Sequence, residues 1–77
     1  METTVLIFGQ LTDITGAAML ECMAVPDTDA LQQQLHQKYP GLAAAKYVIA
    51  VDKIICHQNT VLRAGSTVAL LPPFSGG

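Results

Sequence analysis

The chain has 77 residues, of which 51% are hydrophobic and 13% are charged, and its formal net charge is −2. This size predicts one domain, near the lower limit at which a single core folds without disulfides or metals. The four basic residues are scattered, so no stripe that could follow the phosphates of a nucleic acid is predicted. The start of the chain has no signal peptide or membrane span, which predicts a cytoplasmic protein with reduced thiols at Cys22 and Cys56.

Two strands are expected in the first third of the chain. Residues 4–8 (TVLIF) form a short apolar run that ends at Gly9, which is typical of a strand. Residues 19–25 (MLECMAV) form a second apolar run. We expect the two runs to pair as a hairpin, with residues 9–16 as an unusually long loop between them.

The segment 26–41 carries the signals of a helix at both ends. Thr28 is expected to cap the first turn with its hydroxyl, and Asp29 lies where the positive end of the helix dipole favours an anion. Pro40 and Gly41 are expected to stop the helix. Its apolar stripe is formed by residues four apart, namely Leu31, Leu35 and Tyr39. His36 falls off this stripe, so we expect it on the solvated face.

Three further strands are expected in the second half. Residues 47–51 (YVIAV) and 54–56 (IIC) are apolar, and the Asp52-Lys53 pair between them suits a tight hairpin. Residues 57–65 are expected to form a loop with Val61 and Leu62 turned inwards. Residues 66–71 (STVALL) form the last strand, which cannot continue through the two prolines that follow.

The predicted order is β-β-α-β-β-β, which is the layout of an α+β, ubiquitin-like β-grasp fold. A mixed sheet of about five strands would be covered on one face by one main helix. We expect this domain to occupy residues 1–71, followed by an extended tail at 72–77. No metal site is predicted, because Cys56 and His57 point to opposite faces of a strand and lack a third ligand.

Strand alternation predicts that the sheet has apolar side chains on both faces. The helix is expected to cover Val5, Ile7, Val68 and Leu70. The open face would then carry Leu6, Phe8, Ala69 and Leu71, and Ile55 is a candidate for the same face. An exposed apolar patch on a small domain usually marks an interface. The alternatives are that loops cover this face, or that the alternation is misread by one residue.

The segment after the last strand is unusual for a chain end. Pro72 and Pro73 restrict the backbone and favour an extended segment that cannot join the sheet. Phe74 and Ser75 follow, and Gly76-Gly77 has the thinnest cross-section that a peptide can have. Six extended residues span roughly 20 Å, enough to carry a carboxylate into a narrow channel of another protein. The alternative is an ordinary disordered terminus.

The chain resembles the MoaD/ThiS family of ubiquitin-like sulfur carriers, and within it the MoaD-type small subunit of molybdopterin synthase. The resemblance covers essentially the whole chain through five segments: VLIFGQLTDITG, TDALQQQLHQKYP, IAVDKIIC, LRAGSTVALLPP and PPFSGG. Pro-Pro before the terminal Gly-Gly is typical of the molybdopterin branch. The chain departs from the family pattern at Asp52, where Asn is common, and at Ser66-Thr67, where an acidic pair is common.

The resemblance implies a function for the terminal carboxylate of Gly77. An E1-like adenylating enzyme (MoeB-type) would use ATP to form an acyl-adenylate there, and a sulfur donor would convert it to a thiocarboxylate. The tail, from Pro72 to Gly77, would then enter a MoaE-type large subunit and donate its sulfur to cyclic pyranopterin monophosphate, forming the molybdopterin dithiolene. The family also implies a heterotetramer with the large subunit, in which Phe8, Ile55 and Leu71 form the partner interface.

By the same resemblance the chain binds no cofactor itself and is a non-catalytic, sulfur-donating subunit. Two other function classes stay open at this point. One is a ThiS-like carrier for thiazole synthesis or a ubiquitin-like protein modifier. The other is a simple interaction module whose glycine tail has no chemical role.

Overall fold

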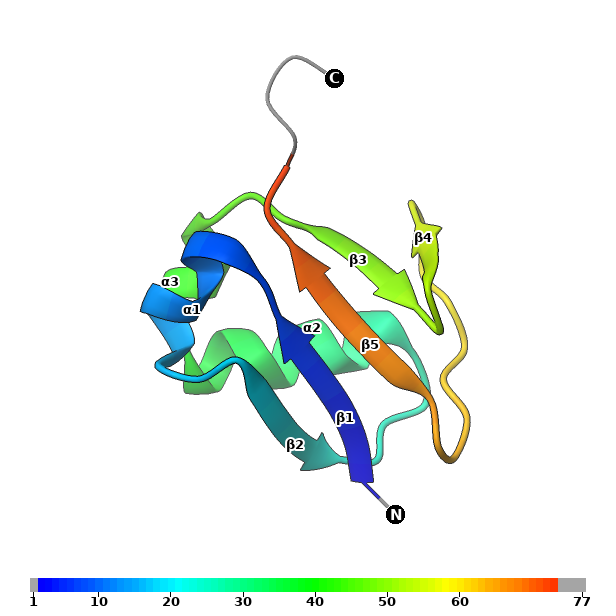
Figure 1. The fold of residues 1–77 in the computed structure, drawn as a ribbon. Helices are drawn as coiled ribbons and strands as arrows, with labels where there is room; N and C mark the ends of the chain where they lie inside the picture. The colour runs from blue at the N-terminus through cyan, green and yellow to red at the C-terminus, as the bar shows by residue number, and fades with distance from the viewer. Residues whose placement is uncertain (1, 74–77) are drawn as a thin grey trace.

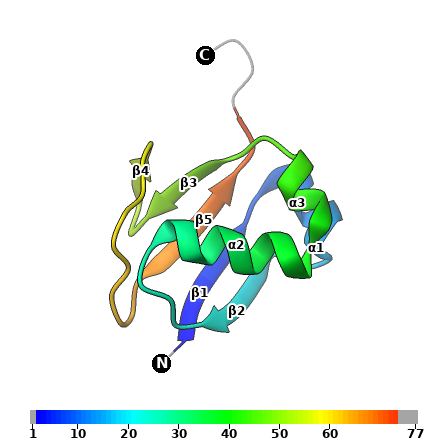
Figure 2. The same ribbon diagram turned by 180° about the vertical axis from the view of Figure 1, so that it is seen from behind.

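The strands of the protein form one mixed sheet with a helix across one face, seen from its two sides in Figures 1 and 2. The computed structural model describes residues 2–73, and within them the sheet has five strands in the order β2-β1-β5-β3-β4. The strands are β1 (Glu2–Ile7), β2 (Met19–Met23), β3 (Val48–Val51), β4 (Ile54–Cys56) and β5 (Thr67–Leu71). The predicted α+β class and the order of the main elements are confirmed.

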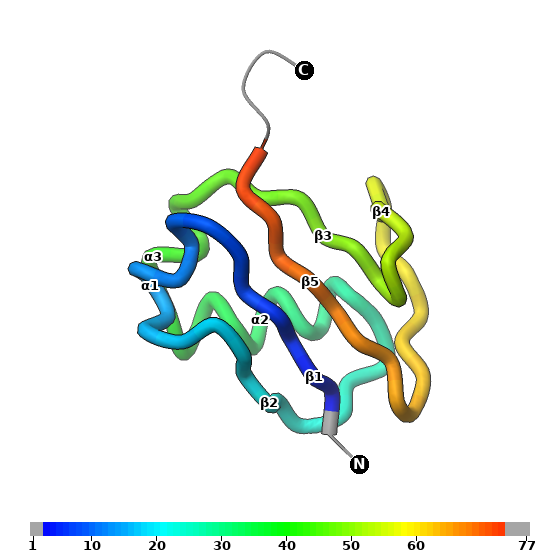
Figure 3. The backbone as a smooth tube through the Cα atoms, in the orientation of Figure 1, coloured from blue at the N-terminus to red at the C-terminus, as the bar shows by residue number. Residues whose placement is uncertain are grey.

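The first and last strands are neighbours at the centre of the sheet. β1 pairs with β5 in parallel, and the other strand pairs are antiparallel. The tube in Figure 3 shows β1 and β5 running side by side toward the same end of the molecule. The end of β5 therefore lies beside the segment that follows β1.

The core lies between the sheet and helix α2 (Thr28–Lys38), as the alternation of the strands predicted. Leu31 and Leu35 of α2 are buried, and Tyr39 at its end packs against the core. Each fully buried leucine stabilises the fold by roughly 1.5–3 kcal/mol relative to an exposed one. The sheet contributes the predicted residues Val5, Ile7, Val68 and Leu70, which are 0–3% exposed.

The predicted cap of α2 is wrong by one residue. The N-cap is Asp27, whose Oδ1 accepts a hydrogen bond of 2.9 Å from the backbone N of Ala30. The hydroxyl of Thr28 instead bonds a distant loop, because it accepts from the backbone N of Thr60 at 3.0 Å and donates to Asn59 at 3.3 Å. Asp29 lies in the first turn, as predicted.

The segment predicted as a loop between the first two strands folds into helical turns. These are η1 (Gly9–Leu11) and α1 (Thr12–Thr15). Leu11 is buried against the core, and Ile14 packs against it. The helical turns were missed because the segment is too short to display a helical period.

Helix α2 ends before Pro40, as predicted, but the chain does not continue as a simple connector. Pro40 begins α3 (Pro40–Ala44), and Leu42 of this helix is fully buried. A proline has no N–H to donate, so it suits the first position of a helix as well as the point where one stops.

The predicted hairpin at Asp52-Lys53 is confirmed. Both residues have positive φ, +49° and +74°, which is the backbone of a two-residue type I′ turn. In the loop that follows β4, Leu62 is buried as predicted. Val61 is 69% exposed, so its predicted inward position is wrong.

Strand β5 ends at Leu71, immediately before the two prolines. The predicted tail residues Phe74, Ser75, Gly76 and Gly77 lie outside the described residues. Within residues 2–73, no helix is long and apolar enough to cross a membrane.

Candidate functional site

The face of the sheet that α2 does not cover carries an apolar groove of about 610 Å³. We call it the open-face groove. It is lined by residues of β1, β5, β3 and β4, by the residue after β1 and by the turn between β3 and β4: Leu6, Phe8, Ala50, Asp52, Lys53, Ile55, Thr67, Ala69 and Leu71. The four residues predicted for this face and the candidate Ile55 are among them, so the alternation was read correctly and, among the described residues, no loop fills the face.

The groove is hollow because the residues at its centre are small. The strand register aligns Leu6 of β1 with Ala69 of β5, Ala69 with Ala50 of β3, and Ala50 with Ile55 of β4. Two small side chains on β5 and β3 are thus flanked by larger ones on the neighbouring strands, Leu6 on β1 and Ile55 on β4. This arrangement leaves a depression into which side chains of another protein can fit.

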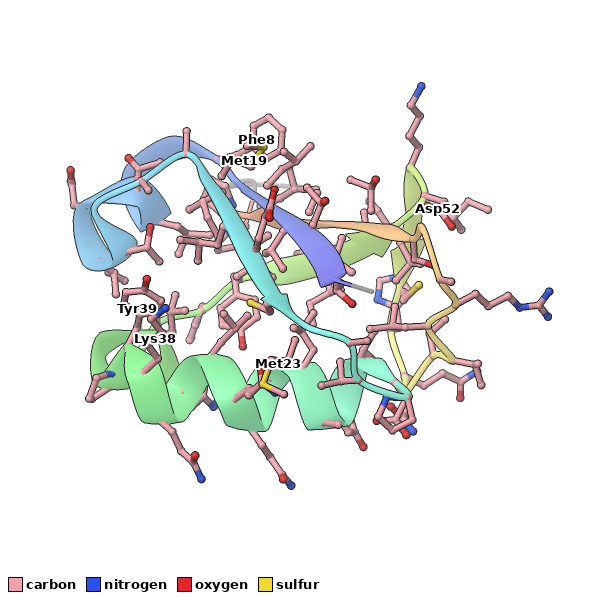
Figure 4. The ribbon with its side chains drawn as sticks, turned by 90° about the horizontal axis from the view of Figure 1, so that it is seen from below. Phe8, Met19, Met23, Lys38, Tyr39 and Asp52 are labelled. Atoms are coloured by element: carbon pink, nitrogen blue, oxygen red, sulfur yellow. The ribbon has the colours of Figure 1, made fainter. Side chains whose placement is uncertain are left out.

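The same row extends to the other edge of the sheet. Met19 of β2 stands opposite Leu6 and is 56% exposed. Figure 4 places Met19 and Phe8 on the side of the sheet away from α2. Met19 was not predicted on this face, because its pairing with Leu6 depends on the register of β2 with β1.

The structure places the three residues expected at a partner interface in the same groove. Phe8 is 44% exposed and Ile55 48% exposed, while Leu71 is half-buried at the end of β5. The backbone N of Phe8 donates to the carbonyl oxygen of Leu70 at 3.1 Å, so Phe8 is held beside the end of β5. One end of the open-face groove therefore meets the start of the predicted tail at Pro72.

The rim of the groove is polar at its other end. Lys53 is exposed, and the Asp52 side chain accepts a hydrogen bond of 3.0 Å from the backbone N of Thr67. An apolar floor with a charged rim is the usual composition of a protein–protein interface.

A second, more polar groove of about 330 Å³ lies between α2 and the strands β3 and β4. Cys56 and His57 line it, and the Cys56 thiol donates to the backbone oxygen of Ile54 at 3.4 Å. Within the part of the chain that is described, no three histidine, cysteine or acidic side chains are close enough to hold a metal. Neither Cys22 nor Cys56 forms a disulfide within the described residues.

Above this groove His36 makes an unpredicted contact. Its Nε2 lies 2.7 Å from the hydroxyl of Tyr47, and that hydroxyl donates to Oε1 of Gln32 at 3.0 Å. The expectation of a solvated His36 is therefore wrong, since the ring is partly buried and links α2 to the start of β3. Burial raises the pKa of Tyr47 above its ordinary value of 10.0.

A mixed sheet with parallel first and last strands at its centre and one main helix across a face defines the ubiquitin-like β-grasp class. The chain belongs to the ThiS family, whose sequence model matches residues 5–77. It is 34% identical over 82 positions to the molybdopterin synthase sulfur carrier subunit of Mycobacterium tuberculosis. That alignment covers 100% of this chain and 99% of the relative.

Solved structures are similar over the whole chain. The small archaeal modifier protein 1 of Methanosarcina acetivorans matches with a TM-score of 0.83 at 21% identity, covering 99% of this chain and 96% of that one. This likeness supports the fold. A complex of subunits 1 and 2 of the molybdopterin-converting factor from Helicobacter pylori contains a chain that matches with a TM-score of 0.74 at 27% identity, with 100% of both chains covered.

Proposed function

We propose that this chain is the sulfur carrier subunit of a molybdopterin synthase and that the carboxyl group of Gly77 carries the sulfur. The observation that carries the proposal is the full-length similarity to a molybdopterin synthase sulfur carrier subunit, at 34% identity. The geometry of the described residues is consistent with it, because an exposed apolar groove meets the start of the tail at one end.

The chemistry follows from the properties of a carboxylate. A free α-carboxyl group titrates at about 3.3–3.7, so it is ionised at neutral pH and resists attack by a nucleophile. Transfer of AMP from ATP, with release of pyrophosphate, converts it into an acyl-adenylate. A sulfur nucleophile then displaces AMP and leaves a glycyl thiocarboxylate. A MoeB-type adenylating enzyme would bind the ATP, and the sulfur donor would reach the acyl-adenylate there, so this chain needs no cofactor of its own.

The folded body would serve as the surface that partners recognise. In the proposed complex the open-face groove, with Phe8, Ile55 and Leu71, packs against an apolar surface of a MoaE-type large subunit, in a heterotetramer. The segment 72–77 would reach the active site of that subunit, where the sulfur is donated to cyclic pyranopterin monophosphate. The carrier would thus supply a reactant, and the catalytic groups would belong to the large subunit. In this role the protein would act in the cytoplasm.

The first experiment is intact-mass measurement after incubation with the adenylating enzyme, ATP and sulfide. We expect a mass gain equal to the replacement of one oxygen by one sulfur. Deletion of Gly77 should abolish this gain and leave the thermal unfolding midpoint unchanged, because the core residues of the described structure lie between positions 5 and 70. A carrier of unchanged mass would argue for a simple interaction module, and loss of folding on the deletion would argue against a separate tail.

Membership of the ThiS family leaves open a carrier for thiazole synthesis or a protein modifier. Reconstitution of the sulfur-loaded chain with a molybdopterin synthase large subunit and cyclic pyranopterin monophosphate separates these functions. Formation of molybdopterin is expected. Loading without transfer to this acceptor would favour the thiazole or modifier function.

A further inference from the structure

Gly9 lies directly against the ring of Pro72, the first residue after β5. A Cβ atom placed on Gly9 would be 2.8 Å from Cγ of Pro72 and 3.4 Å from its Cδ. Carbon atoms make their best non-bonded contact at about 3.5–4.0 Å, so a side chain at this position would overlap the ring. Gly9 also has φ +59°, a conformation in which a side chain is strained. The contact therefore requires glycine.

The Gly9 side of the contact is held in place by its neighbours. The backbone N of Phe8 donates to the carbonyl oxygen of Leu70 at 3.1 Å, which joins the end of β1 to β5. Two residues after Gly9, Leu11 is only 3% exposed in the core. The hydroxyl of Thr12 donates to the Gly9 carbonyl oxygen at 2.9 Å. Gly9 is thus fixed on both sides.

On the other side of the contact, the proline ring is part of the backbone. A proline has its φ locked near −65°, and the residue before a proline is restricted to extended conformations. Both restrictions apply to Pro72, because it is a proline and it also precedes Pro73. A displacement of the Pro72 ring therefore changes the direction in which the chain leaves β5.

We infer that Gly9 is a positioning residue for sulfur transfer, because its contact with Pro72 sets the direction in which the tail leaves the body. This inference rests on the proposed function and adds a residue to it. Gly9 touches neither the sulfur nor the acceptor, and it acts through Pro72.

Alanine at position 9 is the direct test. Its methyl group would push the Pro72 ring away, and because the ring closes on the backbone nitrogen, the backbone must follow. A misdirected tail would reach the acceptor in the productive orientation less often, which lowers the rate of transfer, by about tenfold for a displacement below 1 Å.

The chain contains a matched control for the backbone strain of this substitution. Gly16 has φ +77°, and a Cβ atom there would meet no atom within 4 Å. Gly16→Ala therefore carries the same kind of strain as Gly9→Ala without the contact to Pro72. Both variants should be less stable than wild type, Gly9→Ala by more because of the overlap with Pro72, but only Gly9→Ala should transfer sulfur slowly.

A double-mutant cycle tests whether the effect of Gly9→Ala passes through Pro72 or through Phe8, the residue before Gly9. Pro72→Ala removes both Cγ and Cδ, so Gly9→Ala should cost little in that background. We expect kcat for transfer to fall about tenfold between wild type and Gly9→Ala, and less than about twofold between Pro72→Ala and the double variant. KM for the large subunit should change little, because the open-face groove is unaltered.

The outcomes distinguish the two proposals. If the wild-type chain takes up sulfur but Gly9→Ala slows transfer equally in both backgrounds, the effect does not pass through Pro72 and the inference is wrong. If Gly9→Ala transfers as fast as Gly16→Ala, it is also wrong. A wild-type chain that takes up no sulfur refutes the proposed function and, with it, this inference.

One measurement needs no variant and covers the case in which Gly9→Ala does not fold. In the wild-type protein, nuclear Overhauser effects between the α protons of Gly9 and the ring protons of Pro72 are expected. Their absence would overturn the inference.

Discussion

Asp52 and Thr67 are joined by two hydrogen bonds in opposite directions. The backbone N of Asp52 donates to the carbonyl oxygen of Thr67 at 2.8 Å, and the backbone N of Thr67 donates to Oδ1 of Asp52 at 3.0 Å. The pair ties the turn between β3 and β4 to the start of β5. It therefore holds the polar rim of the open-face groove against the centre of the sheet.

We predict that Asp52→Ala destabilises the protein by about 1–2 kcal/mol. The substitution removes the acceptor of the Thr67 N–H, and it places alanine at φ +49°. Asp52→Asn keeps an acceptor oxygen and tolerates positive φ, so its free energy of unfolding should stay within about 0.5 kcal/mol of wild type. Urea unfolding measures both. Equal losses for the two variants would show that the carboxylate charge matters more than the hydrogen bond.

The contact between Tyr47 and His36 should contribute to stability. Tyr47→Phe leaves Nε2 of His36 and Oε1 of Gln32 without the hydroxyl that joins them. Because the three side chains are only partly buried, we expect a loss of about 1–2 kcal/mol in the free energy of unfolding. Tyr39→Phe is a suitable control, because no hydrogen bond of the Tyr39 hydroxyl is seen in the described structure. A loss as large in the control would contradict the assignment.

The raised pKa of Tyr47 also predicts an alkaline pH dependence. Burial raises the pKa above 10.0 in the folded state, so the unfolded chain loses the phenolic proton first as the pH rises. The contribution of Tyr47 to stability is thus fully present below pH 10 and is lost as the pH rises through the folded-state pKa. The difference in stability between wild type and Tyr47→Phe, measured from pH 8 to 11, should shrink above about pH 10. A constant difference would contradict this prediction.

Phe8→Asp should weaken binding to the large subunit. Phe8 is partly exposed on the open-face groove, so the protein should still fold, but an aspartate would be buried without a partner in the complex. We expect the Kd to rise by about a hundredfold or more. Val61→Asp, at an exposed site outside the groove, should leave it unchanged. Isothermal titration calorimetry measures both, and an unchanged affinity for Phe8→Asp would remove Phe8 from the interface.

Thr28 should be important for stability although it does not cap α2. Thr28→Val keeps the shape of the side chain but removes the acceptor of the Thr60 N–H at a site that is 2% exposed. The expected loss is about 1–3 kcal/mol in the free energy of unfolding. Thr60→Val is the control, because the Thr60 hydroxyl donates to the Gln58 carbonyl oxygen within its own loop. Similar losses in the two variants would contradict the importance of the Thr28 hydroxyl.

Strand alternation predicted the two faces of the sheet, because side chains on a strand point to opposite sides in turn and the single helix can cover only one of them. Local rules could not decide features that depend on distant residues. Asp27 and Thr28 are both good capping residues. Thr28 bonds Asn59 and Thr60 of a distant loop, so Asp27 is the residue that caps the helix. Val61 and Leu62 are similarly apolar, and the bridge of Val61 with Asp27 fixes which one faces inwards.

The candidate site was predictable in part. Phe8, Ile55 and Leu71 could be placed on one face, but the hollow between them depends on the alignment of Ala69 with Ala50. That alignment follows from pairing between strands far apart in the chain. The contact of Gly9 with Pro72 also follows from the pairing of β1 with β5, and no local sequence pattern predicts it.

The central position of β5 has a consequence for how the protein is made. The segment that must pair with β1 is the last of the described elements to leave the ribosome, and pairings between distant segments form slowly. Hairpins at either edge can form earlier, but neither can close the middle of the sheet. A nascent chain therefore has no surface for a partner to bind until the strand that precedes Pro72 has been synthesised and inserted.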